Sequence, residues 1–190
     1  MRLDLKMPEK IIFEEGCIAE LEECASAYTD NIFIAASRTL LKEGKLDGVL
    51  AGLKQRNIKY TVFDGVTGEP SLKMVDGAVN TARAAGCGAV AGVGGGSVLD
   101  LAKCVAALIN NEGGVEQYLE ITDAPKKLKG EVVPFIAVPA TAGTGSEATK
   151  NAVVTSLEKG YKKSLRSDKM LARAALVDPQ LTYGLPREIT

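Results

Sequence analysis

Short apolar runs and segments of helical periodicity alternate along most of this chain. The runs are rich in β-branched, aromatic and small apolar residues, and glycine or polar residues bound them. A continuous apolar run of this kind is typical of a strand that is buried on both faces of a parallel sheet. The sequence therefore predicts strands at Lys10–Glu14, Ile32–Ala36, Tyr60–Phe63, Ala89–Val93 and Val132–Val138.

The segments between these runs place apolar residues three or four positions apart, which is the spacing of one helix face. The first of them carries Ile18, Leu21, Ala25 and Tyr28 at this spacing. Further amphipathic helices are predicted over Leu46–Leu53, Leu72–Ala82 and Val98–Ile109. Strands that alternate with helices predict a parallel sheet with helices on both faces, which is a Rossmann-like α/β fold.

The pattern changes after Gly145. It then predicts a β-hairpin near the C-terminus and a last short strand, at Asn151–Ser156, Tyr161–Arg166 and Ala174–Val177. Leu3–Lys6 is a candidate partner of the first strand, and Leu185–Thr190 has the composition of a helix start.

Composition and charge exclude several classes of protein. The 190 residues are 46% hydrophobic and 25% charged, which are ordinary globular values. Lys and Arg total 23 against 24 Asp and Glu, so the net charge is −1 and gives no electrostatic reason to bind nucleic acid or an anionic membrane. No apolar run is long enough to span a bilayer, and the N-terminal residues lack the apolar core of a signal peptide. We therefore expect a cytoplasmic protein with neither nucleic-acid nor membrane partners.

The sequence contains no histidine. Histidine is the commonest general base at neutral pH and the commonest metal ligand, so histidine-based triads and metal sites within these residues are excluded. The four cysteines, Cys17, Cys24, Cys87 and Cys104, form no C-x-x-C pair. Buried thiols are therefore expected, rather than a disulfide framework or a zinc site.

The strongest local motif is the run Gly94, Gly95 and Gly96 before Ser97, between a predicted buried strand and a predicted helix. Glycine lets a ligand approach backbone N–H groups, and a helix start adds unpaired donors and a partial positive charge. These residues are therefore candidates for a phosphate cradle, although the run matches neither G-x-G-x-x-G nor the Walker loop. In the alternative interpretation Ser97 only caps the helix, with Asp100 in a capping-box role.

A second loop of glycine and hydroxyl residues, Pro139–Glu147, follows the predicted strand Val132–Val138. Its hydroxyl and N–H groups suit a pyrophosphate or an amide-bearing ring, and the alternative is a mobile connector. Because ligands of open α/β sheets bind beyond the carboxyl ends of the strands, both loops are expected along one edge of the sheet.

Charged residues allow further interpretations. Ser37 and Arg38 follow a buried strand where dinucleotide-binding folds place an acidic residue on the adenosine ribose. Arg38 could instead accept a 2′-phosphate, which favours NADP over NAD, and the alternative is a solvated surface arginine. Asp100 and Lys103 are interpreted as a surface ion pair of small energetic value, and Lys162 as a solubilising hairpin residue.

These residues together resemble the iron-containing (group III) alcohol dehydrogenase family, whose superfamily includes glycerol dehydrogenase and dehydroquinate synthase. The resemblance covers essentially the whole chain, and four motifs carry it: Phe63–Val66, Gly94–Lys103, Pro139–Glu147 and Leu176–Thr182. It implies one dinucleotide-binding domain over residues 1–190 that takes NADP or NAD. The segment Thr144–Glu147 favours the alcohol dehydrogenase branch.

The resemblance also implies roles for a set of cofactor-binding residues. They are Gly95, Gly96 and Ser97 at the pyrophosphate, Asp100 near the nicotinamide side, Thr141 and Thr144 along the cofactor groove, and Lys162 at a ribose. Ser37 stands where NAD-preferring members carry aspartate, which agrees with a preference for NADP. Glu69 stands where many members carry asparagine.

Family members continue into a helical domain that holds Fe²⁺, or Zn²⁺ in relatives, on one aspartate and three histidines. This sequence is expected to stop before those ligands, so we expect within it no metal ligand, no catalytic residue and no activity of the chain alone. The complete enzyme would transfer hydride between the nicotinamide and a small alcohol or aldehyde. Uncovered apolar surface favours a homo-oligomer. The alternatives are a stand-alone nucleotide-binding module and a relative of glycerol dehydrogenase or dehydroquinate synthase.

Overall fold

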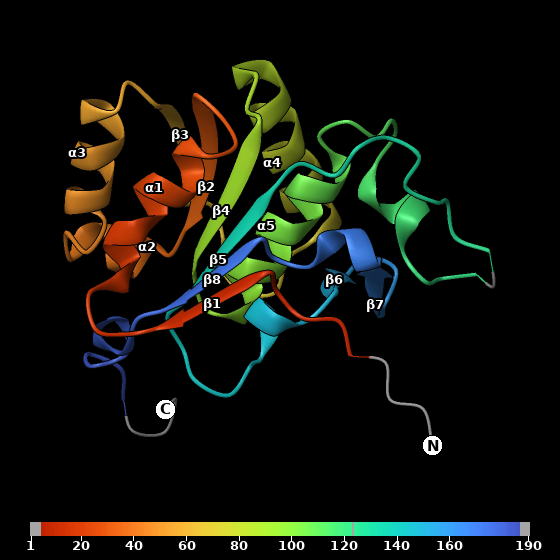
Figure 1. Ribbon diagram of the computed structural model, residues 1–190. Coiled ribbons are helices and arrows are strands. Elements are labelled where there is room, and N and C mark those ends of the chain that lie inside the picture. The colour runs from red at the N-terminus through yellow and green to blue at the C-terminus, as the bar shows by residue number, and fades with distance from the viewer. Residues whose placement is uncertain (1–4, 123, 187–190) are drawn as a thin grey trace.

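A computed structural model describes residues 5–122 and 124–186 of the chain, which form a parallel sheet and a separate β-hairpin (Figure 1). The sheet has the order β1-β8-β5-β4-β2-β3. Its strands are β1 (Lys10–Phe13), β2 (Asn31–Ala36), β3 (Lys59–Phe63), β4 (Ala89–Gly94), β5 (Phe135–Pro139) and β8 (Ala174–Val177). The hairpin consists of β6 (Asn151–Ser156) and β7 (Tyr161–Arg166). The strands and the hairpin predicted from the sequence are confirmed.

The α-helices are α1 (Leu21–Ser26), α2 (Arg38–Lys42), α3 (Asp47–Gln55), α4 (Leu72–Ala85) and α5 (Gly96–Leu108). Four of them confirm helices that the apolar spacing predicted, but α2 was not predicted. A helix of five residues is too short to show a periodicity of its own. The first predicted helix begins instead with a 3₁₀ turn, Cys17–Glu20.

Helices cover both faces of the sheet, as Figure 1 shows. Successive strand residues point to opposite faces, so Phe33 and Ala35 of β2 pack with α4 and α5, whereas Ile32 and Ile34 pack with α1 and α3. The residues of β2 from Ile32 on, and all of β4 and β5, are buried. This burial on both faces explains why these strands are continuous apolar runs and confirms the Rossmann-like α/β fold.

The helix α5 is the most deeply buried helix of the described chain. Ten of its 13 residues are buried, because the sheet covers one side of the helix and β6 of the hairpin covers another. On the sheet side α5 lies directly over Gly92 of β4, where an added Cβ would lie 2.8 Å from the Cβ of Ala102. A helix enclosed in this way is apolar around most of its circumference.

The strand order reverses direction between β2 and β4. From β2 the chain continues to β3 on one side and then to β4 on the other, with β2 parallel to both. Such a switch point leaves a crevice at the carboxyl ends of the two central strands, where open α/β sheets bind their ligands. The fold therefore places the ends of β2 and β4 at the position expected for a binding site.

Two expectations concern the ends of the chain. β1 pairs in parallel with β8, with Lys10 opposite Ala174. Of its candidate partner Leu3–Lys6, residues 3 and 4 lie outside the described residues, and Leu5 and Lys6 belong to no strand. The helix start expected at Leu185–Thr190 falls mostly on residues 187–190, which lie outside the described residues. In the described part of the chain, no helix combines the length and the apolar composition needed to cross a membrane.

Candidate functional site

The carboxyl ends of β2, β4 and β5 lie side by side, and each is followed by a loop that the sequence singled out. Ser37, directly after β2, donates its backbone N–H to the carbonyl of Val93 over 2.8 Å. Ala140, directly after β5, donates its N–H to the carbonyl of Gly94 over 2.9 Å. The three loops therefore meet around the end of β4, beside the switch point of the sheet.

The helix α5 begins at Gly96 with no side chain capping its first turn. Gly95 has the extended backbone of an N-cap residue (φ −71°, ψ 179°), so the alternative interpretation of Ser97 as the cap is wrong. Within the described part of the chain, the backbone N–H groups of Gly96 and Ser97 make no hydrogen bond. Unpaired N–H donors at the positive end of a helix dipole form an anion-binding site.

The loop after β5 forms the opposite wall of this anion-binding site. A Cβ added to Gly95 would lie 3.4 Å from the side chain of Thr141, and one added to Gly96 would lie 3.2 Å from that of Thr144. A Cβ added to Gly94 would lie only 2.8 Å from the side chain of Val98. The absence of side chains on these glycines therefore leaves room between α5 and the two threonines.

A cavity of about 380 Å³ opens next to the N-terminus of α5. Its lining includes Ser37, Leu40, Lys45, Gly95, Thr141 and Leu181. A volume of this size lies in the range of roughly 300–1,000 Å³ that is usual for small-molecule pockets. It combines apolar side chains with hydroxyl groups, which suits a nucleoside that continues into the anion-binding site.

The charged groups near the cavity differ from those the sequence singled out. Arg38 makes an ion pair with Asp64, at 3.3 Å between Nε and Oδ2, and is not part of the cavity lining. Lys45 and Glu43 do line the cavity, and sequence reasoning missed both. Neither belongs to a motif, so no sequence signal pointed to them. Leu181, in contrast, lies within the motif Leu176–Thr182 and could have been found.

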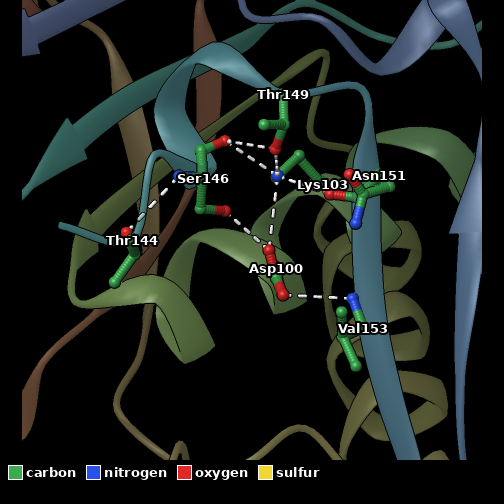
Figure 2. A network of polar contacts seen from close by, with 7 residues as sticks. All are labelled: Asp100, Lys103, Thr144, Ser146, Thr149, Asn151 and Val153. Atoms are coloured by element: carbon green, nitrogen blue, oxygen red, sulfur yellow. Dashed lines mark hydrogen bonds and ion pairs between the residues drawn. The ribbon is translucent and has the colours of Figure 1, made fainter.

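Asp100 and Lys103 form a buried network rather than the surface ion pair that was expected. Lys103 is fully buried, with its Nζ 3.3 Å from Asp100 Oδ1. Figure 2 shows how the network reaches the loop after β5: the Ser146 hydroxyl donates to Asp100 Oδ1 over 2.6 Å, and Lys103 donates to the Ser146 carbonyl over 2.8 Å. The interpretation failed because the hairpin, which the helix spacing does not reveal, covers this side of α5.

The remaining contacts of the network come from residues 149–153. Lys103 also donates to the Asn151 carbonyl over 2.6 Å and to the Thr149 hydroxyl over 3.3 Å. Asp100 Oδ2 accepts the backbone N–H of Val153 over 3.0 Å. Burial lowers the pKa of Lys103, although the negative charge of Asp100 opposes the shift. Both charged groups are therefore saturated with protein partners.

Lys162 lies on the hairpin, in an ion pair with Glu69. Both side chains are about half exposed. The adjacent backbone reinforces this contact, because Thr155 donates its N–H to the Pro70 carbonyl over 2.8 Å. The hairpin is therefore fastened to the loop that leads into α4.

The structure brings together most of the residues that the sequence singled out, but not all of them. Those that meet around the end of β4 are Ser37, Gly94, Gly95, Gly96, Ser97, Thr141 and Thr144. Arg38, Asp100 and Lys162 are each engaged by a carboxylate or an ammonium group of the protein instead. Among residues 5–122 and 124–186, no group of three or more His, Cys, Asp or Glu side chains could hold a metal ion. The described residues therefore do not fit an iron or zinc centre.

Known proteins resemble this chain along most of its length. Long-chain-alcohol dehydrogenase 1 of Geobacillus thermodenitrificans is 41% identical over 160 residues, which cover 84% of this chain and 40% of that protein. Sulfoacetaldehyde reductase of Bilophila wadsworthia is 32% identical over 183 residues, which cover 96% of this chain and 46% of that protein. The chain thus spans about half the length of the curated relatives it matches.

Solved structures give the same result. Sulfoacetaldehyde reductase from Bifidobacterium kashiwanohense in complex with NAD⁺ matches 100% of this chain and 49% of its own, with a TM-score of 0.89 and 30% identity. NADH-dependent butanol dehydrogenase A from Thermotoga maritima matches with a TM-score of 0.88 and 30% identity. The profile of the iron-containing alcohol dehydrogenase family matches residues 8–179. This chain belongs to the iron-containing alcohol dehydrogenase family.

Proposed function

We propose that this chain is the dinucleotide-binding part of a metal-dependent oxidoreductase that transfers hydride between a nicotinamide and a small alcohol or aldehyde. The observation that carries the proposal is the uncapped N-terminus of α5 at the switch point, with two unpaired N–H groups facing a cleft between glycines and threonines. The relatives named above act on alcohols or aldehydes, and one structure holds NAD⁺. These relatives are named for different substrates, so the proposal extends only to alcohols and aldehydes as a class and names no single substrate.

Each part of the site has a role in this proposal. The N–H groups of Gly96 and Ser97 donate to the pyrophosphate oxygens, and Thr141 and Thr144 bound the pyrophosphate on its other side. The adenosine occupies the cavity of about 380 Å³, against apolar residues such as Leu181. When bound, the nicotinamide supplies or accepts the hydride, while this chain holds and orients it.

We further propose that NADP binds more tightly than NAD. Ser37 lines the cavity at the end of β2 with a hydroxyl in place of a carboxylate, so a 2′-phosphate meets no carboxylate at this position, although Glu43 lines the same cavity. Lys45 lines the same cavity and offers an ammonium group to the phosphate. Arg38, in its ion pair with Asp64, lies one residue beyond Ser37 and is a second candidate cation.

The metal ion belongs to the proposed enzyme but not to the residues described here. No described cluster of side chains fits a metal, and the sequence has no histidine. We therefore propose that the residues which activate the alcohol oxygen lie outside this sequence. The same observation favours a second candidate function, a nucleotide-binding module without catalysis.

Titration of the purified chain with NADPH and NADH, followed by nicotinamide fluorescence, tests the proposal. We expect saturable binding that is tighter for NADPH. In Gly95→Ala the added methyl group would lie 3.4 Å from the side chain of Thr141, which is an ordinary contact distance. We therefore expect the variant to fold and the cleft between α5 and Thr141 to become narrower. We expect binding to weaken by at least about tenfold, because glycine at this turn lets the pyrophosphate approach the backbone.

The matched control is Gly77→Ala in α4, where an added Cβ meets nothing within 4 Å. Its affinity for NADPH should equal that of the wild type. Absence of binding by the wild-type chain, or equal weakening in both variants, would contradict the proposed site.

A further inference from the structure

The loop between β5 and β6 is held to the sheet and to α5 at two points, and within residues 141–146 the described structure has only a local hydrogen bond, from the Ser146 N–H to the Thr144 hydroxyl over 3.4 Å. At one end Ala140 donates its N–H to the Gly94 carbonyl over 2.9 Å. At the other end Ser146 is bound by α5 through both its hydroxyl and its carbonyl. Within the described chain, the backbone of residues 141–144 makes no other hydrogen bond to the sheet or to α5. The position of this loop therefore depends on the two tethers.

Glycines make the loop sensitive to its tethers. Gly143 and Gly145 have φ angles of 87° and 63°, in the left-handed region that favours glycine. Glycine also has the greatest backbone freedom to lose, so a loop that contains two of them is ordered only where contacts hold it. Thr141 and Thr144, the threonines that face Gly95 and Gly96, lie between the tethers and move with them.

The tether at Ser146 rests on two residues of α5 that are one turn apart. Asp100 Oδ1 accepts the Ser146 hydroxyl, and Lys103 Nζ donates to the Ser146 carbonyl. The other oxygen of Asp100 accepts the N–H of Val153, so both carboxylate oxygens already have protein partners. The same helix thus begins with unpaired N–H groups and, through Asp100 and Lys103, fixes the loop at Ser146. Figure 2 shows these contacts between the helix and the loop.

We propose that Asp100 and Lys103 are positioning residues: through Ser146 they hold Thr141 and Thr144 at the distance from α5 that the dinucleotide pyrophosphate requires. This inference rests on the proposed function. It assigns to Asp100 an indirect action on the cofactor, through the loop, in place of a contact with the nicotinamide side.

The test compares two serines that are equally buried, each with 6% of its surface exposed. Ser146→Ala removes the hydrogen bond to Asp100 but keeps the carbonyl that Lys103 binds. Ser156→Ala removes a hydroxyl whose partners, the N–H of Lys159 and the side chain of Tyr161, both belong to the hairpin. Amide hydrogen exchange of residues 141–146 and the dissociation constant for NADPH are measured for both variants and the wild type.

We expect Ser146→Ala to raise the exchange rate of residues 141–146 by about tenfold or more, the usual effect of losing a hydrogen bond to a charged group. The NADPH dissociation constant should rise by about tenfold, while exchange in α4 stays at the wild-type rate. Ser156→Ala should change neither the loop exchange nor the affinity. Asp100→Asn, which keeps the shape and removes the charge, should resemble Ser146→Ala.

Two results would overturn the inference. If the loop of Ser146→Ala exchanges at the wild-type rate, the network does not hold the loop. If its exchange accelerates but NADPH binds as to the wild type, the loop position is not used in binding. Hydrogen exchange is measured without a ligand, so it tests the tether independently of cofactor binding. If Ser146→Ala accelerates exchange in the loop but the wild-type chain binds neither NADPH nor NADH, the tether exists and the proposed function is wrong.

Discussion

Lys103 places an ammonium group in the interior of the molecule, where a charge is costly unless it is paired and hydrogen-bonded. The site meets this requirement with the Asp100 carboxylate and with the carbonyl groups of Ser146 and Asn151. Removal of the ammonium group would leave these acceptors buried without a donor. Replacement of Lys103 should therefore lower the free energy of unfolding, because it leaves buried acceptors unpaired in addition to removing the side chain's own contacts.

Lys103→Met, which keeps the length of the side chain, should lower the free energy of unfolding by about 3–5 kcal/mol, the range found when one partner of a buried ion pair is removed. Urea denaturation gives the value. Lys163→Met, at an exposed position of the hairpin, serves as the control and should change it by less than about 0.5 kcal/mol. Similar losses in the two variants would contradict the importance of the network.

Asp168 offers a test of pH dependence. Hydrogen bonds from Lys150 and Lys6 lower the pKa of Asp168 from 3.8 to about 2. Because the native pKa lies below the unfolded value, the ionised carboxylate stabilises the fold above pH 3.8, and this contribution is lost as the pH falls through about 2. In Lys150→Met we expect the pKa of Asp168 to rise, as followed by NMR of the side-chain carboxyl, whereas Lys163→Met should leave it unchanged. A wild-type midpoint near 3.8 would show that the ion pairs do not form.

At the scale of elements, the packing of α5 on β4 depends on one glycine. A Cβ at Gly92 would approach the Cβ of Ala102 to 2.8 Å and the side chain of Leu99 to 3.1 Å, so α5 would have to move away from the sheet. Overpacking of this kind costs about 1–3 kcal/mol, and Gly92→Ala should lower the free energy of unfolding by that amount. Because α5 also carries the proposed anion-binding site, NADPH affinity should fall as well.

The comparison for this prediction is Gly77→Ala, where the methyl group would have open space on an exposed helix position. Alanine is the better helix former, so this variant should be as stable as the wild type or more stable by up to about 1 kcal/mol. Urea denaturation of the two variants side by side separates the packing effect from the general effect of replacing glycine. Equal stability of Gly92→Ala and the wild type would mean that α5 does not contact β4 this closely.

Elements that extend over several residues could be predicted from the sequence, and contacts between distant elements could not. The apolar runs predicted the strands because their burial on both faces leaves no room for polar residues, as at Ile32–Ala36. The glycine run predicted the tight turn from β4 into α5, where we propose the anion-binding site, because such a turn depends only on residues that are adjacent in the sequence. The burial of Lys103, the pairing of Arg38 with Asp64 and the presence of Lys45 in the cavity each depend on where another segment lies. No periodicity within the helices carries that information.

At the scale of the whole molecule, binding and catalysis are expected to be separable in this chain. The described residues hold the proposed anion-binding cleft and a cavity but no cluster that fits a metal. With NADP⁺, Fe²⁺ or Zn²⁺, and a series of primary alcohols, we expect the purified chain to form no reduced nicotinamide above the rate without protein. The absorbance of the reduced nicotinamide gives the rate. Measurable turnover would show that the alcohol-activating groups are present within these residues.

The pairing of β1 with β8 has a consequence for biosynthesis. β1 and its partner in the sheet, Ala174–Val177, are about 160 positions apart in the sequence, since Lys10 lies opposite Ala174. At translation rates of about 5–20 residues per second, the ribosome needs on the order of ten seconds or more to supply this partner. During that interval Ile11 and Phe13 belong to a nascent strand with open hydrogen-bonding groups, which is the kind of segment that chaperones bind. β1 can therefore join the sheet only after β8 has been synthesised, whereas the central strands β2 and β4 can pair much earlier.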